Sequence, residues 1–237
     1  MCTVITLIRP GQDWPVILAA NRDERLDRDW DLPAEHWSDH PGVIGGRDRS
    51  AGGTWMAMNR YGVVAAVLNR PGTLGPAVGK RSRGELPLIA AMQDTAASAV
   101  TAITAANASE WRGFNLVLAD ASGAFFVRGV GHGAPQASAL PDGLSMVTAH
   151  DPNDPDSPRV ARHLPRFAAA PAPRPGDWRA TATSEKLAIR KMLAMIAIRF
   201  LIMMFFLLRF HCPKERASFG RLFCPFGYIG DAKGSHA

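Results

Sequence analysis

Two short apolar runs at the start of the chain constrain its fold more than any other feature. Residues 3–8 read Thr-Val-Ile-Thr-Leu-Ile and residues 15–20 read Pro-Val-Ile-Leu-Ala-Ala. Runs of β-branched and other apolar residues are typical of β-strands. Pro10 and Gly11 between the two runs indicate a turn. The pattern therefore predicts an N-terminal β-hairpin.

The predicted hairpin returns a charged segment to the first residues of the chain. Its second strand ends in Asn21-Arg22-Asp23-Glu24-Arg25, where four charged residues follow an asparagine. Because the two strands have similar lengths, we expect Arg22 and Asp23 to lie beside Cys2. Such a cluster alone would indicate a solvated loop, but its place opposite the only cysteine in residues 1–211 favours a site.

Cys2 stands directly behind the initiator methionine. Methionine aminopeptidases remove Met1 when the next residue is small, which would leave Cys2 with a thiol and a free α-amino group. An α-amine with a pKa of about 7.7–8.0 can act as a base near neutral pH, and a thiol paired with a base is an activated nucleophile. We expect Arg22 to lower the pKa of the thiol and Asp23 to orient the α-ammonium group. The alternative is that Cys2 only begins an apolar strand.

Further strands and two blocks of helix predict an α+β protein. We expect paired strands at 54–58 and 63–68, and later strands at 113–120, 124–128 and 145–149. Ser82 and Glu85 have the spacing of a capping box before helices at about 86–92 and 96–106, and another helix is expected at about 158–167. The start of the first helix, at Arg83, could bind an acidic group of a substrate.

Residues 32–46 are interpreted as a long surface loop. Glu35, His36 and His40 in it match no standard spacing of metal ligands, so we expect no metal site. The glycine-rich stretch at 45–53 lacks the spacing of phosphate-binding loops, and close approach of the backbone at the mouth of a site is the alternative.

Four motifs in order resemble the NRDE family, also called the Transport and Golgi Organization 2 family. They are Ala20-Asn21-Arg22-Asp23-Glu24, Gly52-Gly53-Thr54-Trp55, Arg83-Gly84-Glu85-Leu86 and Gly113-Phe114-Asn115-Leu116. The resemblance covers about residues 1–178. It implies a four-layer αββα sandwich of the N-terminal-nucleophile hydrolase type.

The resemblance also implies roles for individual residues. The opening Met-Cys-Thr-Val-Ile is similar to the bile-salt hydrolase and penicillin V acylase group, in which an asparagine at the position of Asn69 helps to hold the oxyanion. A turn role for Asn69 before Pro71 is the alternative. Many relatives have Ser-Asn where this chain has Ala149-His150, so His150 either replaces that hydrogen-bond donor or is inert. The candidate catalytic residues are Cys2, Arg22, Asp23 and Asn69, and the candidate substrate-binding residues are Asn21, Glu24, Trp55, Arg83 and His150.

Two functions of different classes follow. The first is hydrolysis of an amide or thioester bond by Cys2. The second is non-enzymatic carriage of haem or a lipid-related molecule, because eukaryotic members of the family are implicated in haem movement and lipid homeostasis; Cys2 would then be an iron ligand or purely structural. An inactive hydrolase is a third interpretation. No resident cofactor is expected, and haem enters only as a cargo.

The last part of the chain differs from the rest. Residues 179–237 hold 10 of the 27 Lys and Arg but only 3 of the 21 Asp and Glu, so the net charge of +6 is a property of this tail. It therefore gives no reason to expect nucleic-acid binding by the domain at 1–178. A frameshifted or altered C-terminus is the favoured interpretation, and membrane attachment through the apolar run 192–208 or a buried helix are the alternatives. Three widely spaced cysteines and the lack of a signal peptide predict a cytoplasmic protein.

Overall fold

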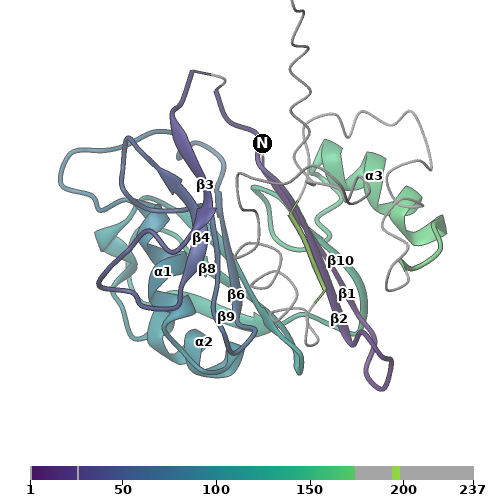
Figure 1. Ribbon diagram of the computed structural model, residues 1–237. Helices are drawn as coiled ribbons and strands as arrows, with labels where there is room; N and C mark the ends of the chain where they lie inside the picture. The colour runs from purple at the N-terminus through teal and green to yellow at the C-terminus, as the bar shows by residue number, and fades with distance from the viewer. Residues whose placement is uncertain (1, 26, 174–193, 198–237) are drawn as a thin grey trace, which may run out of the picture.

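Two β-sheets face each other and helices cover their outer sides (Figure 1). The computed structural model describes residues 2–25, 27–173 and 194–197. In this part of the chain α1 and α2 lie on one side of the sandwich and α3 on the other, so the layers run α, β, β, α. This arrangement confirms the α+β class and the four-layer order expected from the family resemblance.

The smaller sheet contains the N-terminal hairpin. Among the described residues its strand order is β10-β1-β2-β11, and every neighbouring pair is antiparallel. Its strands are β1 (Thr3–Ile8), β2 (Val16–Asn21), β10 (Gly143–Val147) and β11 (Ala194–Ala197). The hairpin predicted from the sequence is confirmed, with Ile8 opposite Val16 and Thr3 opposite Asn21.

The larger sheet follows chain order across seven described strands, from β3 to β9. They are β3 (Trp30–Ala34), β4 (Ile44–Asp48), β5 (Met56–Met58), β6 (Val64–Asn69), β7 (Phe114–Asp120), β8 (Gly123–Gly129) and β9 (Gln136–Ala139). All pairs are antiparallel, and the connection from β6 to β7 contains α1 and α2.

The residues of β6 explain why this sheet is apolar on both faces. Val64, Ala66 and Leu68 lie in the core between the sheets. Ala65 and Val67 alternate with them and pack against the helices instead. Since successive side chains of a strand point to opposite faces, a strand covered on both sides reads as a continuous apolar run.

The helices are short and small-residue positions let them lie close to the sheets. α1 (Leu86–Ala91) follows a 3₁₀ turn at Arg83–Glu85, and α2 (Ala96–Thr104) begins with a capping box of Thr95 and Ser98. A second 3₁₀ turn, Ala108–Glu110, precedes β7. α3 (Pro158–Ala169) packs mainly on β10.

Three details of the sequence analysis were wrong. Residues 32–46 are not a continuous loop, because β3 and β4 overlap this range and form the edge of the larger sheet. The exposed edge strand β9 was not predicted, since all four of its residues are exposed and lack an apolar pattern. Only half of the expected capping box exists: the Oγ of Ser82 accepts from the amide of Gly84, while the Glu85 carboxylate accepts from Arg81.

Glycines explain why β4 can be a strand despite its composition. A Cβ on Gly45 would lie 2.7 Å from the carbonyl oxygen of Met56 on β5, and one on Gly46 would lie 2.6 Å from the ring of Trp55. Close approach of the β5 backbone selects glycine at position 45, and the Trp55 ring leaves room only for glycine at position 46. The glycine-rich stretch packs strands together at this point.

The tail contributes a strand to the smaller sheet. β11 pairs with β2, with Ala194 opposite Ala20 and Ala197 opposite Ile17. The remainder of residues 179–237 lies outside the described residues, so the domain boundary at 178 and the altered C-terminus stay predictions. Within the described ranges, no helix has the length and apolar character needed to cross a membrane.

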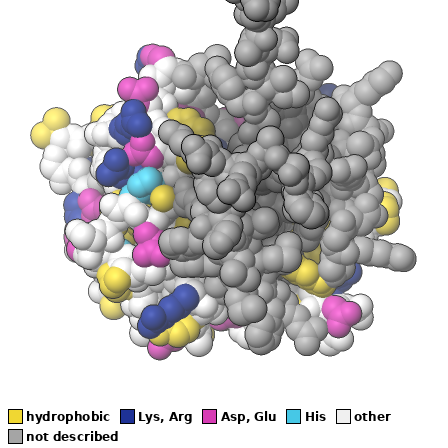
Figure 2. Space-filling view, viewed as in Figure 1, with side chains coloured by type: hydrophobic (Ala, Val, Ile, Leu, Met, Phe, Trp, Pro, Cys, Tyr) yellow, Lys and Arg dark blue, Asp and Glu magenta, His cyan; other side chains and the backbone are white. Residues whose placement is uncertain are grey.

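The surface of the described residues carries charges of both signs. On the face shown in Figure 2, Lys and Arg side chains alternate with Asp and Glu. Elsewhere in the described residues, ion pairs such as Arg81–Glu110 and Arg47–Asp31 form at 2.7 Å. The pattern agrees with the nearly balanced charge expected for residues 1–178.

Leu18→Ala is expected to lower the free energy of unfolding by about 2–5 kcal/mol, because it leaves a cavity between the sheets. Leu18 is 0% exposed, whereas Leu74 is 75% exposed and provides the matched control. Leu74→Ala should change the free energy by no more than about 0.5 kcal/mol. Urea unfolding followed by tryptophan fluorescence measures both. Equal unfolding midpoints for the two variants would contradict the placement of Leu18 in the core.

Candidate functional site

The register of the N-terminal hairpin places Cys2 beside the charged segment that follows β2. Thr3 pairs with Asn21, so the residues just beyond this pair, Cys2 and Arg22, are neighbours at the open end of the hairpin. The Sγ of Cys2 donates to the backbone carbonyl of Asp23 at 3.8 Å. Cys2 is partly buried and packs against the core between the sheets. The spatial relation predicted from the strand lengths is therefore present.

Burial dominates the chemistry of the thiol. It raises the pKa of Cys2, and the negative charge of Asp23 acts in the same direction, while the backbone hydrogen bond to Asp23 and the charge of Arg22 oppose it. The charge of Arg22 lowers the pKa of the thiol as expected, but desolvation of the thiolate is the larger effect and the net pKa is raised. A thiol in this environment needs a base in order to react.

Several donors hold the carboxylate of Asp23. Among them, Asn21 donates to Oδ1 at 2.7 Å, and Arg159 on α3 donates to Oδ2 at 2.8 Å. Burial by itself raises the pKa of Asp23, but hydrogen bonds from the N-terminal amine, Arg159 and Asn21 outweigh it, and the net effect is a lowered pKa. Asp23 is therefore an oriented, ionised carboxylate next to Cys2. Asn21, predicted to bind substrate, is placed as a partner of Asp23.

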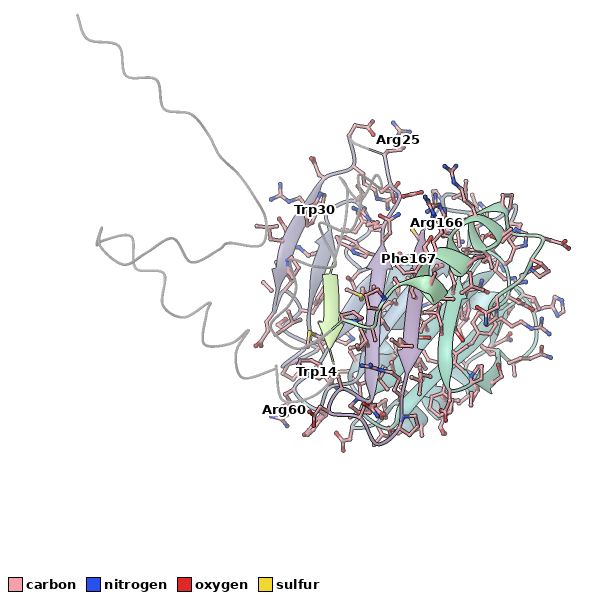
Figure 3. All side chains as sticks on the ribbon, turned by 90° about the vertical axis from the view of Figure 1, so that its right-hand side faces the viewer. Trp14, Arg25, Trp30, Arg60, Arg166 and Phe167 are labelled. Atoms are coloured by element: carbon pink, nitrogen blue, oxygen red, sulfur yellow. The ribbon has the colours of Figure 1, made fainter. Side chains whose placement is uncertain are left out.

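Arg22 and Trp55 are stacked on each other. The guanidinium carbon of Arg22 lies 4.0 Å from the ring centroid of Trp55, and the edge of Trp30 meets that ring at 5.6 Å. Burial lowers the pKa of Arg22, although the nearby carboxylates of Glu24 and Asp48 oppose the change. An arginine remains protonated in such a site, so the geometry supplies one cation fixed on an aromatic face. Trp30 projects at the end of the molecule that also carries Arg25 (Figure 3).

Glu24 belongs to a chain of ion pairs behind Arg22. Its carboxylate lies 3.6 Å from both Arg22 and Arg28. Arg28 also donates through Nε to Asp48 at 3.0 Å. These contacts connect the segment after β2 to β4, and they place Glu24 as a neighbour of Arg22.

A buried asparagine ties the two sheets together at the same end of the sandwich. Asn115 on β7 donates to the carbonyls of Thr148 and His150, at 3.0 and 2.8 Å. Thr148 follows Val147, which pairs with Val4. Asn69 ends β6 opposite Phe114, the residue before Asn115, so the candidate oxyanion residue lies at the Cys2 end of the sandwich.

The ring of His150 is directed at a carboxylate. Its Nδ1 lies 3.4 Å from Asp154. The backbone carbonyl of His150, and not its side chain, takes part in the bond to Asn115. The side chain of His150 therefore interacts with Asp154 in the same loop.

Arg83 is used by the backbone of the loop that follows β6. Its Nη1 donates to the carbonyls of Thr73 and Gly113, at 2.7 and 3.0 Å. Burial, together with the charge of Arg112, lowers the pKa of Arg83 to about 10. Within the described residues, the hydrogen bonds of the Arg83 side chain join it to this loop and to Gly113.

Two residues of this region were not selected from the sequence. Asn115 could have been recognised from the sequence, because it is a polar residue inside a seven-residue strand that is buried throughout. No sequence pattern indicated Arg159, since it lies 136 residues from Asp23 in the chain. Among the described residues, no group of three or more His, Cys, Asp or Glu is arranged to hold a metal ion.

Comparisons with known proteins agree on a family and on a fold. The family model described as Transport and Golgi organisation 2 matches residues 1–189. The Transport and Golgi organization protein 2 homolog of Bos taurus is 32% identical over 112 residues, which are 45% of this chain and 39% of that protein. The match therefore spans well under half the length of this curated relative.

Solved structures of N-terminal-nucleophile hydrolases share the fold. The Caenorhabditis elegans ortholog of N-acylethanolamine-hydrolyzing acid amidase superimposes with a TM-score of 0.60 and 10% identity, covering 83% of this chain and 92% of that one. A variant of the conjugated bile acid hydrolase of Clostridium perfringens is similar with a TM-score of 0.44 and 15% identity, covering 60% of this chain and 52% of that one.

Asp23→Asn is expected to remove a stabilising contribution that depends on pH. The folded-state pKa of Asp23 is lowered, so its contribution is complete above the unfolded value of about 3.9 and is lost as the pH falls through the lower folded value. The difference in unfolding free energy between wild type and Asp23→Asn should therefore be largest above about pH 5 and shrink below about pH 4. Urea unfolding at a series of pH values, from above about 5 to below about 4, measures this difference in unfolding free energy.

The exposed residue Asp142 offers a matched control. Asp142→Asn should give a difference from wild type that is small at every pH. A difference for Asp23→Asn that stays constant down to the acid end would contradict the ionised, hydrogen-bonded state of Asp23.

Proposed function

The chain belongs to the Transport and Golgi organisation 2 family and has the fold of N-terminal-nucleophile hydrolases, and we propose that it hydrolyses an amide or thioester bond with Cys2 as the nucleophile. The proposal includes removal of Met1, which gives Cys2 a free α-amine. It also includes a cytoplasmic, reducing setting, in which the thiol stays available.

One observation carries the proposal: the hairpin holds the thiol of Cys2 against Asp23, whose carboxylate is itself fixed by Asn21 and Arg159. A carboxylate in this position suits the α-ammonium group of Cys2, which carries the proton during turnover. A purely structural cysteine before β1 would not need an ionised, hydrogen-bonded carboxylate beside it.

In the first step the thiol attacks the carbonyl carbon of the substrate. The S–C bond forms, the thiol proton passes to the neutral α-amine, and the electron pair of the C=O bond moves to the oxygen. Burial raises the pKa of the Cys2 thiol, so transfer to a base is the route to the nucleophile. Asn69 and a backbone N–H are proposed to hold the oxyanion.

In the second step the oxyanion collapses and the bond to the leaving group breaks. The leaving amine or thiolate takes the proton back from the α-ammonium group, and a thioester to Cys2 remains. Water then attacks this thioester with the α-amine again as the base, which releases the carboxylic acid and restores the thiol. Arg22, fixed on Trp55, supplies positive charge near the thiol throughout.

The worm protein of the same fold is named for hydrolysis of an amide. Amides are therefore the first class of bond to test, and thioesters are the second.

Cys2→Ser is expected to lower turnover of a cleavable acyl amide or thioester by at least about a hundredfold, since a hydroxyl is far less acidic than a thiol. Serine keeps the size of the side chain, and Met1 is still removed before it. The measurement is hydrolysis of a panel of acyl amides and thioesters by full-length protein in which the removal of Met1 has been verified. Cys212→Ser is the matched control and should keep its turnover.

Wild type and Cys2→Ser also distinguish the hydrolase from the alternative function, a carrier. A carrier that binds haem iron through Cys2 would lose affinity in a haem titration and change its absorbance spectrum on Cys2→Ser, because a thiolate ligand is removed. Undiminished hydrolysis by Cys2→Ser contradicts the nucleophile. A loss confined to haem binding would favour the carrier.

A further inference from the structure

We propose that Arg70 is a positioning residue, which fixes Asn69 relative to Cys2 by tying the end of β6 to the chain segment after β10. The inference rests on the proposed function, in which Cys2 is the nucleophile and Asn69 holds the oxyanion. It goes further by naming the contact that sets the relation between these two residues.

Cys2 and Asn69 belong to different sheets. Cys2 precedes β1 in the smaller sheet, whereas Asn69 is the last residue of β6 in the larger sheet. The two sheets face each other across an apolar core (Figure 1). Apolar burial is non-directional, but an oxyanion donor has to lie about 2.7–3.1 Å from the oxygen that it stabilises. A site divided between two sheets therefore needs a directional contact that joins them.

The guanidinium of Arg70 makes such a contact. Its Nη1 donates to Oδ1 of Asp151 at 2.8 Å and to Oδ1 of Asn115 at 2.6 Å. Asp151 lies in the segment that follows β10, and β10 pairs with β1. Asn115 on β7 donates to the carbonyls of Thr148 and His150 in that same segment. Arg70 thus joins the end of β6 to the segment that continues the neighbour of β1.

The backbone of Arg70 is held as well. Its carbonyl oxygen accepts from the amide and the hydroxyl of Thr73, at 3.2 and 2.8 Å. On its other side, Asn69 pairs with Phe114 of β7. Because the main chain is fixed on both sides of Arg70, the position of its guanidinium is coupled to the position of Asn69, the residue to which it is directly bonded.

A second arginine orients the carboxylate of Asp151. Arg128 on β8 donates to its Oδ2 at 2.8 Å, and Arg128 in turn donates to the side-chain carbonyl of Gln136 on β9 at 3.0 and 2.8 Å. The side chains of Arg70 and Asp151 are 21% and 41% exposed. Partly exposed ion pairs contribute little to stability, so we infer that the main effect of this network is on geometry.

Loss of the Arg70 side chain should therefore have a specific effect. It leaves the thiol of Cys2 and its neighbours after β2 in place, but the amide of Asn69 is no longer fixed relative to that thiol. Reactions of Cys2 that pass through an oxyanion should become slower, and reactions without an oxyanion should not.

The test compares two such reactions of Cys2 in the full chain. With p-nitrophenyl acetate, the sulfur attacks the ester carbonyl through an oxyanion, the α-amine takes the thiol proton, and the C–O bond breaks as p-nitrophenolate leaves with the electron pair. With iodoacetamide, the sulfur displaces iodide from a CH2 carbon and no oxyanion forms. Mass spectrometry of the peptide that contains Cys2 gives both rates, after subtraction of any acetylation that persists in Cys2→Ser.

Arg70→Gln should lower the rate of acetylation about tenfold and leave alkylation within about twofold of wild type. Asn69→Ala removes the proposed donor itself and should lower acetylation at least as much. Arg70→Lys keeps a charged donor, so its loss should be smaller, about threefold.

Asp151→Asn should repeat the effect of Arg70→Gln. The double variant should be no slower than either single variant, because both substitutions break the same contact. Additive losses would contradict a role that depends on the ion pair between these two side chains.

Arg60→Gln is the matched control, because Arg60 is an exposed arginine in the turn before β6, at the opposite end of that strand from Asn69. It should leave both rates unchanged. Equal slowing of acetylation and alkylation by Arg70→Gln overturns the proposal, since that result describes a general loss of structure. An unchanged acetylation rate, or the same loss in Arg60→Gln, also overturns it.

Failure of the positioning role is distinguishable from failure of the proposed function. Slower acetylation in Asn69→Ala but not in Arg70→Gln overturns the role of Arg70 and leaves Asn69 as the oxyanion donor. An acetylation rate unchanged by Asn69→Ala contradicts both roles. The nucleophile is tested separately, by hydrolysis with wild type and Cys2→Ser.

Discussion

The register between β1 and β2 is the constraint on which the site depends. Pairing of Thr3 with Asn21 sets Cys2 and the charged segment after β2 at the same end of the hairpin. The same register directs Val4, Val16 and Leu18 into the core between the sheets. A slip by one residue would turn these side chains to the opposite face and separate Cys2 from Asp23. The burial that stabilises the hairpin therefore also fixes the site.

The proposed site needs a second fixed element, because the residue proposed to hold the oxyanion, Asn69, ends a strand of the opposing sheet. Asn115 is 0% exposed, and its side-chain amide donates hydrogen bonds to two backbone carbonyls after β10. Its carbonyl oxygen accepts from Arg70 at 2.6 Å, and Arg70 in turn binds Asp151 at 2.8 Å. A buried polar group is tolerated when its hydrogen bonds are made. Here these hydrogen bonds fix the position of one sheet end relative to the other. Apolar packing alone would set their separation less specifically.

How far the sequence predicts this arrangement depends on the range of each interaction. The hairpin and the approach of Asp23 to Cys2 could be derived from two neighbouring strands, and the αββα order came from the family resemblance. The edge strand β3 and its neighbour β4 were missed, and in β4 the close packing of Gly45 and Gly46 makes a strand that composition does not suggest. Arg159 was missed because α3 meets β1 only through the tertiary fold. The sequence indicated the lowering effect of Arg22 on the pKa of Cys2, but not the larger rise from burial, since burial is a property of the whole fold.

The central claim is that the hairpin presents a nucleophile and its base on one residue. The most direct measurement is the mass of the N-terminal peptide from purified full-length protein, taken before and after reaction with an amine-selective reagent. The account predicts a peptide that begins at Cys2, lacks the mass of methionine and is modified at a free α-amine. A peptide that retains Met1, or whose Cys2 amine is blocked, would contradict it.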